Sequence, residues 1–240
     1  MRLFIIFILF SLCGCSTTAI NISGEKPFPF IKTQNKPSPT VLIAHGCDGW
    51  NNGNYYQWVF DFYKLGYNAI LVDSFEFRGY KNLCNRGAIV SPSTRANDFE
   101  AVSIWAKSQP WHKGGVAVVG FSHGGSTALN IANNSRIKNI DAVVSYYPGC
   151  ISSFVGENIY NPKIPAQVHL ADKDDWTLVS HCGEMKKYEV YHYPNATHGF
   201  DLPAPKRNYF GYNLEYDEEA TSVSKKRVEE FLKRTLNIKE

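Results

Sequence analysis

A serine flanked by glycines is the residue of this sequence best suited to chemistry. Gly120, Ser122 and Gly124 form a Gly-x-Ser-x-Gly pattern, which follows directly after the apolar, β-branched run 116–119. A serine on this spacing, between a strand and a helix, is held in a sharp turn with its hydroxyl exposed. The glycines are needed because larger side chains would keep the strand and the helix apart. The pattern predicts a nucleophile elbow, against the alternative of a glycine-rich turn with a surface serine.

A nucleophilic serine needs a general base, and the base needs an acid that orients it. The apolar segment 188–193 predicts a strand that ends shortly before His198, and the segment 167–171 predicts another that runs into the acidic cluster 172–175. The order serine, aspartate, histidine is that of α/β-hydrolases and differs from the orders in chymotrypsin and subtilisin. Each candidate follows the C-terminal end of a predicted strand, where open α/β sheets place their sites. We therefore predict His198 as the base and one of the clustered aspartates as its acid.

Acyl transfer also requires two backbone N–H groups aimed at the oxygen that becomes negative. The apolar run 40–44 predicts a buried strand that leads into Cys47, and His123 directly follows the serine. We expect the backbone amides of Cys47 and His123 to form this oxyanion hole. The six cysteines and seven histidines show no Cys-x-x-Cys or His-x-x-x-His spacing. We therefore expect no metal site and no cofactor.

The elements that must position these residues alternate along the chain. Helices are predicted at 54–65, 94–108 and around 126–132, further strands at 67–72 and 141–146, and a final charged helix around 228–232. Such alternation indicates a mostly parallel sheet with helices on both faces. The 240 residues, 44% hydrophobic and 20% charged, suffice for one substantial core. We predict a single domain of the α/β-hydrolase fold over residues 40–240.

Six short segments taken together resemble the dienelactone hydrolase family of α/β-hydrolases, and they span most of residues 40–235. They lie at 45–49, 73–79, 120–125, 147–150, 174–177 and 193–200. In that family the acid follows a strand as Gly-x-x-Asp. Ala171 replaces the glycine here, and the fourth residue is Asp174, so the resemblance implies that Asp174 is the acid. The founding enzymes use a cysteine nucleophile, and a serine at position 122 implies a general carboxylesterase or lactonase.

The expected function is therefore a serine hydrolase that cleaves a small ester or lactone through an acyl-enzyme. Arg78 follows a strand end on the site side of the sheet, and we expect it to bind a substrate carboxylate in a bidentate pair, or else to bond loop carbonyls. The alternatives are a peptidase or acyltransferase on the same fold, or a non-catalytic binding protein of the cell envelope. A net charge of +3 without a basic stripe argues against nucleic acid as a partner.

The N-terminus predicts export from a bacterial cytoplasm. Arg2 precedes the apolar run 3–10, which is too short to span a bilayer but is typical of a signal peptide. Residues 1–15 end in a lipobox-like sequence, in which cleavage would leave Cys15 acylated and anchored in the membrane. Ordinary secretory cleavage a few residues later is the alternative. Residues 16–39 carry four prolines and predict a tether, so we expect a lipid-anchored or periplasmic protein of the envelope, or a secreted one.

Export changes the interpretation of the cysteines, because an envelope compartment permits disulfides. Cleavage and lipidation account for the first two cysteines of the chain. Four remain, namely Cys47, Cys84, Cys150 and Cys182. They allow three pairings, and the sequence neither chooses among these nor excludes free thiols.

Overall fold

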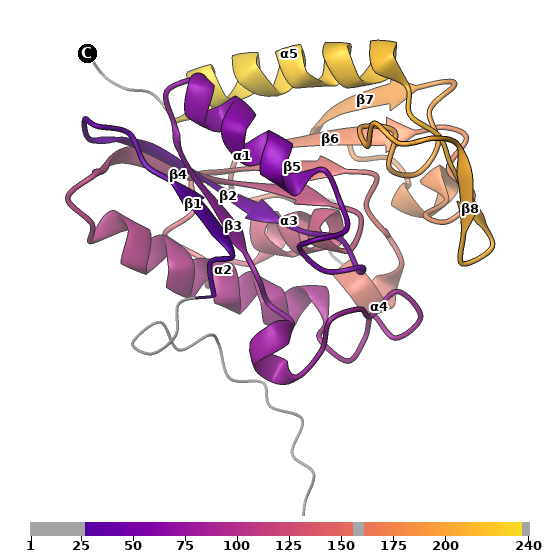
Figure 1. The fold of residues 1–240 in the computed structure, drawn as a ribbon, viewed down its shortest axis with the longest axis horizontal. Helices are drawn as coiled ribbons and strands as arrows, with labels where there is room; N and C mark the ends of the chain where they lie inside the picture. Colours follow the sequence, from indigo (N-terminus) through magenta and orange to yellow (C-terminus); the bar gives the residue numbers. More distant parts are fainter. Residues whose placement is uncertain (1–26, 156–160, 237–240) are drawn as a thin grey trace, which may run out of the picture.

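A computed structural model describes residues 27–155 and 161–236 of the chain (Figure 1). The predicted signal peptide, the predicted lipidation site Cys15 and the first part of the predicted tether lie outside these residues. Within the described residues, no helix has the length and apolar character needed to cross a membrane.

The core is a seven-stranded sheet in the order β1-β3-β2-β4-β5-β6-β7. Its strands are β1 (Phe30–Lys32), β2 (Ser38–Ala44), β3 (Asn68–Val72), β4 (His112–Phe121), β5 (Ala142–Tyr146), β6 (Ala166–Ala171) and β7 (Glu189–Tyr193). Only β1 pairs antiparallel, and the other pairs are parallel. The parallel strands are apolar almost throughout, because helices cover both of their faces.

Two helical layers cover the sheet, as Figure 1 shows. The helices are α1 (Tyr55–Lys64), α2 (Pro92–Lys107), α3 (His123–Asn133), α4 (Ser152–Val155) and α5 (Glu218–Thr235). Alternate strand residues point to opposite faces. Leu42 and Ile70 therefore pack in one core cluster with α2 and α3, whereas Val41 and Leu71 pack in a second cluster with α1 and α5. This arrangement confirms the predicted fold class.

The smaller elements lie beside the carboxyl ends of the strands. Short 3₁₀ helices span Glu76–Arg78 and Val179–Cys182. A hairpin of β8 (Arg207–Tyr209) and β9 (Tyr212–Leu214) forms a separate two-stranded sheet after the loop that carries His198. These loops and this hairpin form the walls of the site described below.

The structure corrects the predicted start of the domain. Residues 30–32 were expected within the tether, yet they form β1 and pair with β3, with Ile31 opposite Ile70. Aromatic residues in and before this strand pack against the helices. A strand of three residues is too short to show a periodic pattern in the sequence. The Phe30 ring lies 5.1 Å from that of Tyr56 on α1, and the Phe28 ring lies 4.6 Å from that of Trp105 on α2.

Helix α2 also begins earlier than predicted, at Pro92 instead of position 94. The Ser91 hydroxyl accepts a hydrogen bond from the Thr94 N–H at 3.1 Å and caps the helix. Pro92 suits the first helical position because its missing N–H would have no helical partner there.

Candidate active site

The turn between β4 and α3 holds Ser122 in a conformation that few serines adopt. Its φ is 54° and its ψ is −116°, outside the common regions for a residue with a side chain. The neighbouring glycines explain how the chain closes this turn. A Cβ on Gly120 would lie 2.0 Å from the Gly124 carbonyl oxygen, and one on Gly124 would lie 2.0 Å from the Ala44 carbonyl oxygen. Only glycine fits at either position, as the sequence pattern predicted.

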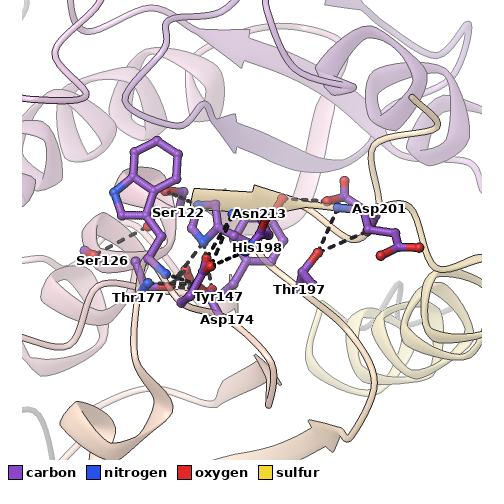
Figure 2. Close-up of polar contacts among 12 residues, drawn as sticks. Ser122, Ser126, Tyr147, Asp174, Thr177, Thr197, His198, Asp201 and Asn213 are labelled. Carbon is purple, nitrogen blue, oxygen red and sulfur yellow. Dashed lines mark hydrogen bonds and ion pairs between the residues drawn. The ribbon is translucent and has the colours of Figure 1, made fainter. Parts of the chain in front are cut away.

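Three side chains from separate loops form a hydrogen-bonded chain at the carboxyl end of the sheet (Figure 2). The Ser122 Oγ lies 2.9 Å from His198 Nε2, and His198 Nδ1 lies 2.7 Å from Asp174 Oδ2. Nδ1 carries the proton in this network, because a carboxylate can only accept, and Nε2 is left to accept from the serine. This is the arrangement in which an imidazole can take a proton from a hydroxyl.

Asp174 is held as a carboxylate by its own loop. Its Oδ1 accepts the N–H groups of Trp176 at 2.8 Å and Thr177 at 2.7 Å, and its Oδ2 accepts the Thr177 hydroxyl at 2.6 Å. Burial raises the pKa of Asp174, but its interactions with His198 and Thr177 outweigh burial and leave the pKa below its ordinary value. A charged acceptor therefore faces the imidazole at neutral pH.

The other two aspartates of the acidic cluster have different partners. Asp172 lies 2.7 Å from His192 Nδ1 at the surface, and Asp175 accepts the backbone and side-chain N–H groups of Asn213 on the hairpin. Of the three aspartates in the cluster, the structure places Asp174 at His198, the position that the family resemblance implied.

Two aromatic rings contact the His198 imidazole. The Tyr147 ring lies 4.7 Å from it and the Trp176 ring lies 4.9 Å from it. Tyr147 is fixed in turn by Asp201, whose Oδ1 accepts the Tyr147 hydroxyl at 2.5 Å, while its Oδ2 accepts Trp58 Nε1 at 2.7 Å. Burial raises the pKa of Asp201, whose side chain accepts hydrogen bonds from neutral donors, Tyr147 and Trp58.

Sequence reasoning missed Thr177, Tyr147 and Asp201. Thr177 follows the acidic cluster at a spacing that many turns share, and Asp201 follows His198 by three residues. Only the backbone turn at Tyr147, with φ of 35°, turns the aromatic side chain toward the site. Tyr147 and Thr177 lie in two of the six segments that resemble the family, but the sequence assigned no role to either residue.

The two residues predicted to supply the oxyanion hole, Cys47 and His123, line a cavity together with Ser122. His123 is the first residue of α3, so its N–H is one of those that the helix cannot pair. Cys47 and Ser122 line the same cavity. The His123 side chain points away: its Nε2 donates to the Gly87 carbonyl at 2.9 Å, and its Nδ1 accepts from Arg95 at 2.9 Å. Burial, and then Arg95, lower the pKa of His123 to about 3, so this imidazole stays neutral.

Two disulfides resolve the open question of cysteine pairing. Cys47 is bonded to Cys84, and Cys150 is bonded to Cys182. Each bond joins two loops at the carboxyl end of the sheet, 37 and 32 residues apart in sequence. The first bond anchors the loop that supplies the Cys47 amide. No free thiol is left among these four cysteines.

Arg78 bonds a loop carbonyl, as one of its two predicted roles required, and it also pairs with a carboxylate of the protein. Its Nη1 and Nη2 donate to the two carboxylate oxygens of Asp98 on α2, at 2.7 and 2.8 Å, and Nη1 also donates to the Ser74 carbonyl at 2.7 Å. The guanidinium thus binds a carboxylate bidentately, but that carboxylate belongs to the protein. Arg78 does not line either cavity beside Ser122. The structure corrects the expectation that it holds a substrate.

The described residues contain no group of three or more histidines, cysteines, aspartates or glutamates placed to hold a metal ion.

A serine on a strand-to-helix turn, with its histidine and acid on later loops of a mostly parallel sheet, defines the α/β-hydrolase class. The profile of the dienelactone hydrolase family matches residues 29–236. The chain belongs to this family, as the resemblance of its six segments predicted.

The sequence identity between this chain and individual relatives is low. Carboxymethylenebutenolidase 1 from Cupriavidus pinatubonensis is 28% identical over 145 residues, which cover 57% of this chain and 56% of that protein. The match thus spans little more than half of the curated relative. A candidate dienelactone hydrolase from Klebsiella pneumoniae has a TM-score of 0.66 at 18% identity, over 83% of this chain and 88% of that one. An esterase from Pyrococcus furiosus has a TM-score of 0.61 at 19% identity, over 86% and 90%. These structures share the fold.

The elbow packing predicts that Gly124→Ala lowers the free energy of unfolding by at least about 3 kcal/mol, because its methyl group meets backbone that cannot rotate away. Gly79→Ala is a matched control: φ is +81° there, but no atom lies within 4 Å of the added Cβ. We expect it to cost about 1 kcal/mol from backbone strain alone. Urea denaturation measures both values. Equal losses would contradict the close approach of α3 and β2.

The Arg78–Asp98 ion pair predicts that removal of Arg78 lowers stability but leaves the substrate preference unchanged. Arg78→Ala leaves the fully buried Asp98 carboxylate without its bidentate partner, and we expect a loss of about 3 kcal/mol in unfolding free energy. The ratio of kcat/KM for a half-ester with a free carboxylate to that for its neutral diester should stay unchanged. A loss of kcat/KM for the half-ester alone would contradict this prediction and would support a role of Arg78 in binding the substrate.

Proposed function

We propose that the protein is a serine hydrolase that cleaves a small carboxylic ester or lactone through an acyl-enzyme. The observation that carries this proposal is the continuous hydrogen-bonded chain from Ser122 through His198 to Asp174. Membership of the dienelactone hydrolase family supports the reaction class. The esterase fold of the Pyrococcus furiosus protein and the lactone-cleaving name of the Cupriavidus relative agree with it.

In the first step, the Ser122 Oγ forms a bond to the substrate carbonyl carbon while His198 Nε2 takes the hydroxyl proton. The carbonyl oxygen becomes negative and is stabilised by the N–H groups of Cys47 and His123. The imidazolium that forms is stabilised by the Asp174 carboxylate. The bond to the alcohol then breaks, and His198 returns the proton to the departing oxygen.

In the second step, His198 accepts a proton from water, which attacks the acyl-enzyme at the same carbonyl carbon. The Ser122 ester bond breaks, and the serine recovers its proton from His198. The Tyr147 and Trp176 rings keep the imidazole in one orientation through both steps, since rotation would remove it from the serine. A lactone passes through the same steps, with its alcohol still joined to the acid.

We also propose that the protein is exported and acts in the cell envelope. The two disulfides support this location, because such bonds persist in oxidising compartments and are rare in the cytosol. The signal peptide and the Cys15 anchor predicted from the sequence would bring the chain there. Residues between Cys15 and β1 would then connect the anchor to the catalytic domain.

The serine mechanism predicts that Ser122→Ala lowers kcat for 4-nitrophenyl acetate by a factor on the order of 10⁶. The change removes the nucleophile but little packing, so thermal unfolding should be unchanged within a few degrees. Labelling by a fluorophosphonate should also vanish, since only an activated serine reacts. Ser135→Ala, at an exposed serine, is the control. Activity of Ser122→Ala within about tenfold of wild type would refute the proposed function.

The contacts of the acidic cluster predict that Asp174→Asn slows turnover by roughly 10⁴, because the amide cannot stabilise the correct tautomer of His198. Asp172→Asn and Asp175→Asn remove a surface contact and a hairpin contact, and each should change kcat by less than about tenfold. Steady-state kinetics on the three folded variants decides among them. Greatest sensitivity at Asp175 would mean that the acid differs from the one the structure places at His198.

A further inference from the structure

Two cavities meet at Ser122, and they differ in size. The first has a volume of about 50 Å³, and its lining includes His198, Asp48, Asn54 and Arg207. The second has a volume of about 240 Å³, and its lining includes Leu83, Ile151, Phe154 and Tyr212. Cys47, Cys84, Ser122 and Trp176 line both. An ester bound at the serine must therefore place its acid in one cavity and its alcohol in the other.

His198 decides which part of the ester enters which cavity. The departing alcohol oxygen has to receive its proton from Nε2 of this imidazole, so it must leave on the side that His198 lines. His198 lines the small cavity and does not line the large one. His123, whose amide faces the carbonyl oxygen, lines the large cavity. The acyl group of the substrate consequently extends into the large cavity.

The large cavity suits an apolar group that contains a ring. A cavity of roughly 150 Å³ lined by apolar side chains is enough to hold benzene, and this one exceeds it. Leucine, isoleucine, phenylalanine and tryptophan side chains on its walls favour burial of hydrocarbon. The polar groups nearest the serine there are already paired, since the Thr177 hydroxyl donates to Asp174 and the His123 ring bonds Gly87 and Arg95.

Glycines and disulfides keep the large cavity in shape. The Phe154 ring lies 5.4 Å from the His123 ring, and a Cβ at Gly87 or Gly149 would meet Phe154 at 2.9 or 3.2 Å. The bond between Cys150 and Cys182 joins the loops that carry Ile151 and His181 on the cavity wall. A cavity that is formed before binding costs less ordering of loops when the substrate enters.

The small cavity suits a short alcohol. Its volume of about 50 Å³ has no room for a phenyl ring. Asp48 lies in its wall beside Tyr55, and burial raises the pKa of this carboxyl to about 6. Arg207, which is exposed, adds a donor to the lining. The small volume therefore limits the size of the alcohol.

We propose that the preferred substrates are esters of an apolar acid of arylalkanoyl size with a small alcohol, an inference that rests on the proposed serine hydrolase function. In the acylation step, the bond from Ser122 Oγ to the acyl carbon forms inside the large cavity. The bond from that carbon to the alcohol oxygen breaks, and the His198 proton goes to the alcohol in the small cavity. Ile151, on the rim of the large cavity, is then a specificity-determining residue for the acid.

Two isomeric esters test this orientation directly. Methyl 3-phenylpropanoate carries its ring on the acid, and 2-phenylethyl acetate carries the same ring on the alcohol, at the same molecular formula. We expect kcat/KM of the full chain to be at least about tenfold higher for methyl 3-phenylpropanoate, since one apolar contact region commonly changes specificity by such a factor. Equal values, or a preference for 2-phenylethyl acetate, would overturn the inference.

Variants at the rim of the large cavity distinguish an effect on binding of the acid from an effect on catalysis in general. Ile151 is 41% exposed, so Ile151→Asp should fold, and we expect it to lower kcat/KM for methyl 3-phenylpropanoate by about tenfold while 2-phenylethyl acetate stays within twofold. Ile151→Trp, which narrows the mouth, should act in the same direction. Ile104→Asp is the matched control, at an isoleucine on α2 that is 53% exposed and lines neither cavity. Equal effects of Ile151→Asp on both isomers would overturn the inference.

The same measurements distinguish failure of the inference from failure of the proposed function. Hydrolysis of 4-nitrophenyl acetate that depends on Ser122, without discrimination between the isomers, would refute the orientation and leave the serine hydrolase intact. Loss of all three activities, together with absent fluorophosphonate labelling of the wild-type chain, would refute the proposed function and the orientation with it.

Discussion

The close approach of β4, β2 and α3 around the elbow is the constraint on which the rest of the site depends. Ser122 can adopt a positive φ only because the helix starts immediately after it, and the helix can start there only because Gly124 touches the backbone of β2. This contact fixes the serine hydroxyl and also fixes the His123 amide at the helix N-terminus. One packing contact therefore positions both the proposed nucleophile and one of the proposed oxyanion donors.

The acid and the base are held by a second arrangement, which is polar and aromatic. Asp174 stays charged because its interactions with His198 and the hydrogen bonds from its own loop outweigh burial, and two aromatic rings contact the His198 imidazole. The buried Asp201 carboxylate fixes one of these rings from behind. The site thus combines a rigid backbone turn with an imidazole whose partners are fixed before any substrate binds.

Sequence reasoning succeeded where a short pattern follows from a local physical need. The elbow glycines, the histidine after β7 and the alternation of strands and helices are of this kind, and the family resemblance was enough to single out Asp174. It failed where the deciding partner is distant in sequence. Arg78 looks the same whether its carboxylate is a substrate or Asp98, twenty residues away on α2. Strand β1 and the two disulfide pairings likewise depend on contacts across the fold, which no local pattern records.

The hairpin of β8 and β9 differs from the other walls of the site in how it is attached. Both disulfides lie elsewhere, and its described contacts include hydrogen bonds from Asn213 to Asp175 and from Asn82 to the Tyr209 hydroxyl, with Tyr212 stacked on Trp176 at 4.8 Å. It contributes no strand to the central sheet. We therefore expect that this hairpin can be replaced by a hairpin of another sequence. The Ser122 turn, His198 and the disulfide-bonded loops would stay unchanged.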